Sequence, residues 1–557
     1  MTQYILLLAG CAMLYGGLYA PKMQHEPTRP WTKDIIASEH AVILGQALVL
    51  GAFLLLLWGC VRGDFTLMQV FANSNTTLPV RYRIAATWSS YESSLLFWLS
   101  TCCVMGFWLH GNAKARFVVI AGVWALGLQC FANPLARLHA TPQDGMGFNP
   151  LLQDVGVMIH PPVLYMAYSC YCLAFVCASV RQSSMAYLRA GNGFMALAIG
   201  LGGWWAYREL GWGGYWFFDP IENISLMVFL AGVAAHHMAL RGRESLAGAP
   251  FVLSLLGTFF ARSGMVTSVH SFAEAGSSYA ILVFAVWCGY IAAQMPSWPA
   301  DTGSFRIGVG GLWVGVGVIL LSLVGPAVYL AISGMRLDLR PDFFVQTLVP
   351  ILLVGLACFV WHVRFLRWGL MVAGLLTWFI SWYLAFGYTL GAATIYASYV
   401  LHRRKLSAFL GHVGLGVLVL GICCNVQFGQ EWTVSLAEGQ TTPIGQYMAT
   451  FTGAEFGQVE NYAKQVVCIT ISDARGNEIV SLRPQMRLYL HQQVITSDAY
   501  IWSTVFYDWY AVVQSVRDNV AGITIYYKPA VSLIWLGMAL MAAGFFVGLG
   551  RGFTTRR

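Results

Sequence analysis

Charged residues are scarce in this chain of 557 residues, where Asp, Glu, Lys and Arg make up 10% of the total against roughly 25% in soluble domains. Hydrophobic residues make up 58%, and the mean hydropathy is +0.63. This composition excludes an ordinary soluble protein and indicates an all-α polytopic membrane protein. The net charge of +8 includes no basic tract longer than Arg403–Lys405, so we expect a lipid bilayer and no nucleic acid as a partner.

Cysteine motifs are also missing, since the thirteen cysteines form neither a C-x-x-C nor a C-x-x-C-H sequence. The chain therefore carries no covalently attached haem of its own and no zinc-site spacing. It also offers no Ser-His-Asp or paired-carboxylate arrangement for acid–base catalysis. The first 20 residues lack a basic n-region, which favours a retained first span over a cleaved signal peptide.

Long apolar runs are abundant, and about 20 such residues suffice to cross a hydrocarbon core of about 30 Å. They predict about fifteen transmembrane helices, near residues 3–20, 40–61, 90–109, 117–134, 160–180, 191–207, 224–240, 250–268, 278–295, 308–332, 345–362, 368–384, 386–401, 407–424 and 529–549. If these helices alternate in direction, the basic loops all fall on one side, which the positive-inside rule makes cytoplasmic. The N-terminus then lies outside and the C-terminus lies in the cytoplasm.

A polar region precedes the last span and contains alternating runs such as VVCITISD and GITIYY. Such alternation is typical of half-buried strands, so we expect a small extracytoplasmic β-rich domain. The predicted organisation is a transmembrane helical bundle over 1–424, a β-rich domain over 425–527, and a final helix with a cytoplasmic tail over 528–557.

The most unusual stretch is Trp204 to Asn223, WWAYRELGWGGYWFFDPIEN, which is too polar to complete a span and very rich in aromatic residues. We expect a flat docking surface for a large planar ligand on the outer face. Gly213 and Gly214 allow the backbone to approach a ligand closely, and Asp219 is placed to cap the next helix. The alternative is an ordinary interfacial belt of aromatic residues.

Four histidines fall at two depths. His160 and His270 lie at the outer rim, level with the aromatic stretch, where they suit axial ligation of a haem iron. His237 and His412 lie inside the membrane, where an ionisable residue is a functional-site hypothesis by default. They suit a second haem held between two spans, although hydrogen bonds to neighbouring helices would also explain them. His236 is adjacent to His237 but points about 100° away on a helix.

The run WGGYWFFDPIE, from Trp212 to Glu222, resembles the WGxWWxWDxxE signature of the WWD haem-handling family of cytochrome c biogenesis. The resemblance is strongest to its haem lyase branch of CcmF and NrfE proteins. It continues through NSNTTLPVRYRIAATW, FNPLLQDVGVMIHPP, LLGTFFARSGMVTSVHSF and IYYKP, and so covers most of the membrane part. Tyr215 and Phe218 replace family tryptophans, which keeps an aromatic face but loses two indole N–H donors.

The resemblance implies a haem lyase subunit in the bacterial inner membrane, with the N-terminus and the WWD loop (204–223) in the periplasm. Haem would arrive from the chaperone CcmE and be attached to apocytochrome c, presented by CcmH-type subunits, through thioether bonds to CxxCH thiols. His160 and His270 would hold this delivered haem. His237 and His412 would hold a permanent haem b, reduced by quinol.

The residues predicted to contact a haem are those of the signature together with arginines near the outer face. Guanidinium groups suit carboxylates such as haem propionates. The complete set, besides the four histidines, is Trp212, Gly213, Gly214, Tyr215, Trp216, Phe218, Asp219, Glu222, Arg83, Arg208 and Arg262.

Two other functional classes fit the same residues. In a haem transporter the histidine pairs would be successive stations across the bilayer. In a quinol-oxidising redox subunit the protein would turn over quinol without a chaperone or an apocytochrome.

Overall fold

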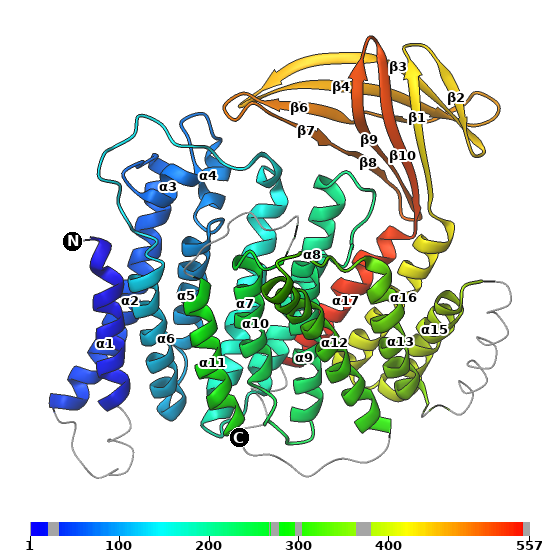
Figure 1. Cartoon of the computed structure of the whole chain (residues 1–557). Helices are drawn as coiled ribbons and strands as arrows, with labels where there is room; N and C mark the ends of the chain where they lie inside the picture. Colours follow the sequence, from blue (N-terminus) through cyan, green and yellow to red (C-terminus); the bar gives the residue numbers. More distant parts are fainter. Residues whose placement is uncertain are drawn as a thin grey trace.

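Apolar helices form one body, and a β-sandwich covers one end of it (Figure 1). The computed structural model describes residues 2–19, 33–266, 268, 278–295, 304–361, 363 and 380–549. The main helices are α1 (Ile5–Tyr19), α2 (Lys33–Arg62), α3 (Met68–Asn73), α4 (Val80–Ala86), α5 (Tyr91–Gly106), α6 (Gly111–Phe131), α7 (Val155–Ser179), α8 (Met185–Glu209), α9 (Pro220–Ala239), α10 (Ala249–Arg262), α11 (Tyr279–Ala293), α12 (Ser304–Ser333), α13 (Pro341–Val360), α15 (Trp382–His402), α16 (Leu406–Phe428) and α17 (Val531–Leu549).

Nine helices in the described ranges are long and apolar enough to cross a membrane, and three more are apolar but shorter. The mainly helical membrane class is therefore confirmed. The total of about fifteen spans and the extracytoplasmic side of the sandwich stay predictions. Most of the run predicted over 368–384 lies outside the described residues.

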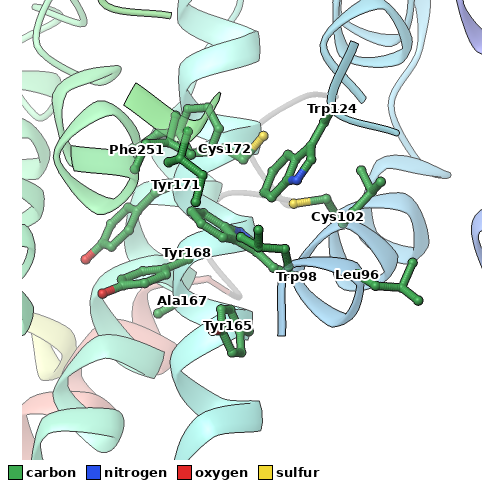
Figure 2. Close-up of a cluster of buried hydrophobic side chains, with 14 of the residues drawn as sticks. Leu96, Trp98, Cys102, Trp124, Tyr165, Ala167, Tyr168, Tyr171, Cys172 and Phe251 are labelled. Atoms are coloured by element: carbon green, nitrogen blue, oxygen red, sulfur yellow. The ribbon is translucent and has the colours of Figure 1, made fainter. Parts of the chain in front are cut away.

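Aromatic side chains fill the centre of the bundle (Figure 2). Trp98 of α5 is fully buried and meets Trp124 of α6 edge-on, with ring centres 4.7 Å apart. Tyr168 of α7 and Phe251 of α10 also contact its ring, with ring centres 5.2 and 6.0 Å away. Edge-to-face contacts of this kind add to the stabilisation from buried area alone, so four helices share one core.

Glycines bring α16 and α17 into close contact. A Cβ atom added at Gly414 of α16 would lie 2.6 Å from the Met541 amide nitrogen, and one added at Gly537 of α17 would lie 2.6 Å from that of Leu418. Distances this short leave room for hydrogen only. Small residues commonly permit such backbone contact between membrane helices.

The sandwich continues this helix pair, because β1 follows α16, β10 precedes α17, and the two strands pair antiparallel from Gln430 opposite Tyr527. One sheet has the order β1-β10-β9-β8, and the other has the order β2-β3-β4-β6-β7 with β5 beside β4. The predicted β-rich region is thus confirmed as a β domain. The strands are β1 (Gln430–Ala437), β2 (Thr441–Ile444), β3 (Tyr447–Val459), β4 (Tyr462–Ser472), β5 (Glu478–Leu482), β6 (Gln485–Tyr489), β7 (Val494–Asp498), β8 (Tyr500–Ser503), β9 (Tyr507–Arg517) and β10 (Val520–Pro529).

The sandwich packs on the polar loops between α2 and α5 and between α6 and α7, and on the end of α8. At α8, the Tyr207 hydroxyl donates to the Asp508 carboxylate at 3.1 Å, and burial raises the pKa of Asp508 above its ordinary range. These contacts fix the sandwich over the aromatic stretch. The contacts with the loops are Arg81–Glu460, Gln153–Asn461, Phe148–Gln492 and Gly145–His491.

We predict that Gly537→Val destabilises the protein, because the added side chain would force α17 away from α16. Overpacking of this kind costs about 1–3 kcal/mol or more. The measurement is the thermal unfolding midpoint of purified protein in detergent. Gly411→Ala on α16 is the control, since its methyl group would meet no atom within 4 Å. Equal midpoints for the two variants would show that the helices tolerate separation.

Candidate functional site

Two carboxylates of the aromatic stretch shape the loop that carries it. Asp219 caps α9 by accepting a hydrogen bond from the Ile221 amide at 3.0 Å, as predicted. Glu222 reaches back and accepts from the amides of Phe217 and Asp219 at 2.9 and 3.1 Å. This reciprocal capping box satisfies amides that the helix leaves without partners. Both acids of the signature therefore hold the backbone of the loop.

The aromatic rings of the loop do not form one flat surface, so that expectation is wrong. Trp212 meets Phe217 edge-on at 4.7 Å, and Trp216 meets Phe218 edge-on at 6.1 Å, with planes 89° apart in both pairs. Aromatic quadrupoles favour such perpendicular arrangements over face-to-face contact. Trp212 is 45% exposed and offers its ring to an incoming ligand.

The two residues that replace family tryptophans point into the protein. Tyr215 packs edge-on against Trp535 of α17, with ring centres 6.0 Å apart. Phe218 stacks nearly parallel on Phe344 of α13 at 5.3 Å, and its backbone φ of 54° is unusual for a residue with a side chain. Both positions thus help to anchor the loop to the membrane helices.

The glycine pair of the loop is required by neighbouring rings of the protein itself. Gly213 has a φ of 61°, and a Cβ atom there would lie 2.7 Å from the Tyr526 ring of the sandwich. A Cβ atom at Gly214 would lie 2.6 Å from Phe217. The expected close backbone approach is present, but its partners are aromatic side chains of this chain.

His160 lies in the second turn of α7, at a point where the helix is opened by proline. Pro161 has no N–H group, so the Val157 carbonyl lacks its helical donor. The Trp88 indole nitrogen donates to that carbonyl at 2.9 Å. The helix next to His160 is therefore tied to the segment before α5.

The His160 ring has a defined orientation against α8. Its Nδ1 donates to the Ala198 carbonyl at 2.9 Å, which places the lone pair needed by a metal ion on Nε2. The ring lies 6.0 Å from Trp205, and a Cβ atom at Gly202 would lie 2.9 Å from its Cε1. These contacts fit an axial haem ligand.

The predicted partner ligand, His270, lies outside the described residues. Ser268, two positions earlier, donates a hydrogen bond from its hydroxyl to Asp219 at 2.6 Å. The segment that leads to His270 is thus attached to the end of the WWD loop.

Two of the predicted arginines, Arg83 and Arg208, make side-chain hydrogen bonds within the outer loops and helix ends. Arg83 donates to two backbone carbonyls of its own loop at 2.8 and 2.6 Å. Arg208 donates to Asp154, the cap of α7, at 3.0 Å and lies over the Trp204 ring. Arg262 is the last residue of α10. Their roles toward a haem stay predictions.

The inner histidines face each other between α9 and α16. His237 Nδ1 donates to the Val233 carbonyl and His412 Nδ1 donates to the Ala408 carbonyl, both at 2.8 Å. Both Nε2 atoms are thereby set as lone-pair donors. The ring centres are 6.3 Å apart, with planes 80° from parallel. Two metal–nitrogen bonds of about 2 Å, plus about 1 Å from each nitrogen to its ring centre, add up to about 6 Å, so the pair fits one iron.

Two residues that the sequence did not single out surround His412. Phe359 of α13 stacks on its ring at 4.4 Å, and His402 at the end of α15 lies 5.2 Å away. In the sequence, His402 lies at the edge of a loop, directly before the basic cluster Arg403–Lys405. No sequence pattern distinguishes Phe359 from other apolar residues. His236 packs on Phe545 instead, and both of its ring nitrogens are buried without a hydrogen-bond partner among the described residues.

Comparison with known proteins gives consistent matches over nearly the whole chain. A profile described as cytochrome C assembly protein matches residues 88–266, and one described as the CcmF C-terminal beta-sandwich matches residues 427–529. The cytochrome c-type biogenesis protein CcmF of Pseudomonas aeruginosa is 30% identical over 88% of each chain. CcmF of Escherichia coli is 31% identical over 89% of each chain, and NrfE of Haemophilus influenzae is 29% identical over 88% of this chain and 89% of that one.

A solved structure named Cytochrome c Heme Lyase CcmF superimposes with a TM-score of 0.80, covering 98% of this chain and 97% of that one at 18% identity. This likeness shows that the two proteins share a fold. The matches to the two CcmF proteins, at 30% and 31% identity over most of the chain, show the family. The chain belongs to the CcmF family of cytochrome c-type biogenesis proteins.

Proposed function

We propose that this protein is the haem lyase subunit that receives haem from the periplasmic chaperone CcmE and attaches it to apocytochrome c. CcmH-type subunits would present the CxxCH thiols at the outer face of the bacterial inner membrane. The observation that carries the proposal is the facing pair His237 and His412, whose ring centres lie 6.3 Å apart. A lyase that reduces the haem it receives needs two haem sites, one at the outer face and one inside the membrane.

At the outer level, the residues of this chain act by holding the delivered haem still. His160 would bind its iron through Nε2, and Trp212 would contact the porphyrin. Thioether formation adds S–H across a vinyl double bond, so a carbon–sulfur bond forms and the hydrogen ends on the neighbouring carbon. This addition needs no external acid–base pair when the vinyl groups and thiols are aligned, so positioning supplies most of the catalysis.

At the inner level, His237 and His412 would hold a resident haem b. When bound, it would supply electrons, taken from quinol, for reduction of the delivered haem. The carbonyls of Val233 and Ala408 keep the proton on Nδ1 of each ring, so that Nε2 stays available. Phe359 restricts rotation of the His412 ring by stacking on it.

We predict that His412→Ala abolishes the b-type absorption of the purified protein, because one of two axial ligands is lost. His160→Ala should keep that absorption but fail to trap haem-loaded chaperone. The measurements are the reduced-minus-oxidised spectrum and co-purification with the chaperone. An unchanged spectrum for His412→Ala would refute the inner ligand pair.

The near-perpendicular imidazoles predict a distinctive paramagnetic signature. A ferric haem between imidazole planes 80° apart should give a highly anisotropic low-spin EPR signal, whereas parallel planes give a rhombic one. Phe359→Leu should broaden or shift this signal by releasing the His412 ring. Phe545→Leu, which alters a ring contact of His236, is the control. A rhombic signal from the unmodified protein would contradict the described geometry.

Gly202→Ala should impair the outer site alone, since the added methyl group would press on the His160 ring at 2.9 Å. We expect about a 10-fold or greater loss of trapped haem-loaded chaperone with the inner absorption unchanged, because small misplacements of positioning residues are costly. Gly200→Ala is the matched control on the same helix, where the methyl group would meet the Cβ atom of Met538 on α17 at 3.2 Å and would not touch His160. Equal trapping by both variants would count against His160 as a ligand.

A further inference from the structure

The turn between β8 and β9 exposes two consecutive apolar side chains. Val505 is 75% exposed, and Phe506 is 78% exposed. Their neighbours in the chain, Ser503, Thr504 and Tyr507, carry no charge. Single exposed apolar residues need no explanation, whereas contiguous apolar surface marks interaction with a protein or a membrane. The turn is therefore a candidate interaction surface.

Hydrogen bonds hold this turn in one shape. The Thr504 amide donates to the Tyr507 carbonyl at 2.9 Å. The Thr504 hydroxyl oxygen accepts from the amides of Phe506 and Tyr507 at 3.2 and 3.0 Å. Because the backbone is already ordered, presenting the two apolar side chains to a partner costs little conformational entropy.

The turn is attached to the start of α17, which fixes its depth. The Ser532 hydroxyl donates to the Val505 carbonyl, and the Ala530 amide donates to the Phe506 carbonyl at 2.8 Å. Helix α17 has 19 residues and is a candidate membrane span. At about 1.5 Å per residue it is about 28 Å long, close to the hydrocarbon thickness of about 30 Å. Its first residues therefore lie at the edge of the hydrocarbon core, and the turn lies there with them.

Exposed apolar residues on the neighbouring helices continue this surface. Val426 and Phe428 at the end of α16 are exposed, as is Leu536 of α17. Such side chains on candidate membrane spans suit contact with lipid. Figure 1 shows one end of β8 and β9 directly above these two helices. A bilayer that surrounds α16 and α17 therefore also reaches the turn.

We propose that Val505 and Phe506 insert into the bilayer surface and so attach the β-sandwich to the membrane beside α17. An aliphatic and an aromatic side chain both gain free energy on leaving water. The flanking rings of Trp502 and Tyr507 contact each other with centres 6.2 Å apart, and these two residue types favour the membrane–water interface. This inference does not depend on the proposed function, since it concerns only how the sandwich is held.

The test introduces a photo-crosslinking side chain, as Phe506→p-benzoylphenylalanine or Val505→p-benzoylphenylalanine, into the full chain. The purified protein is placed in nanodiscs of phosphatidylethanolamine and phosphatidylglycerol and irradiated. Benzophenone forms a covalent bond with a C–H group that it touches, so both variants should gain the mass of one phospholipid. Mass spectrometry of the intact protein measures this shift.

Phe456→p-benzoylphenylalanine is the matched control. Phe456 of β3 is also 78% exposed, but it lines a hollow of the sandwich surface with the charged residues Lys464 and Arg483. We expect no phospholipid adduct at this position. A thermal unfolding midpoint equal to that of the unmodified protein shows that each variant is folded.

Two results would overturn the proposal. The first is a folded Phe506 variant that forms no phospholipid adduct, or no more of it than the Phe456 variant. The second comes from irradiating the same variants in cell membranes. A protein adduct at position 506 in place of a lipid adduct would show that a partner subunit covers the turn.

Discussion

The glycine-mediated contact between α16 and α17 is the constraint on which both candidate haem levels depend. Helix α16 carries His412, and α17 carries Trp535, which packs on Tyr215 of the WWD loop. Above the bundle the same pair continues as β1 and β10, and Tyr526 of β10 fills the space left by Gly213. One close helix contact therefore sets the position of a candidate inner ligand, the sandwich and the loop together.

The WWD loop is consequently a rigid part of the fold. Its acids cap α9 and its glycines admit rings of the protein. The two aromatic residues that differ from the family, Tyr215 and Phe218, pack against Trp535 and Phe344. An indole N–H would gain little at such positions, because the surrounding contacts are aromatic. Trp212, by contrast, is 45% exposed and offers its ring to a ligand.

Periodicity and composition predicted the helical membrane class, the β domain and the Asp219 cap, because each depends on local sequence. The similar depth of His237 and His412 in the membrane, together with the resemblance to the haem-handling family, predicted that these two residues form a pair. Contacts between distant segments could not be predicted, such as Phe218 on Phe344 or His402 beside His412. The expected flat aromatic surface was wrong because ring quadrupoles favour edge-to-face packing, which a residue count does not reveal.

The central claim is that the outer and inner histidines serve two haems that never exchange. The most direct measurement delivers haem labelled with iron-57 from the chaperone to protein whose inner site already holds unlabelled haem. Mössbauer spectroscopy then locates the label, with His160→Ala and His412→Ala used to assign the two sites. The account predicts label at the outer site only. Label at the His237–His412 pair would contradict it and would favour transport of haem across the membrane.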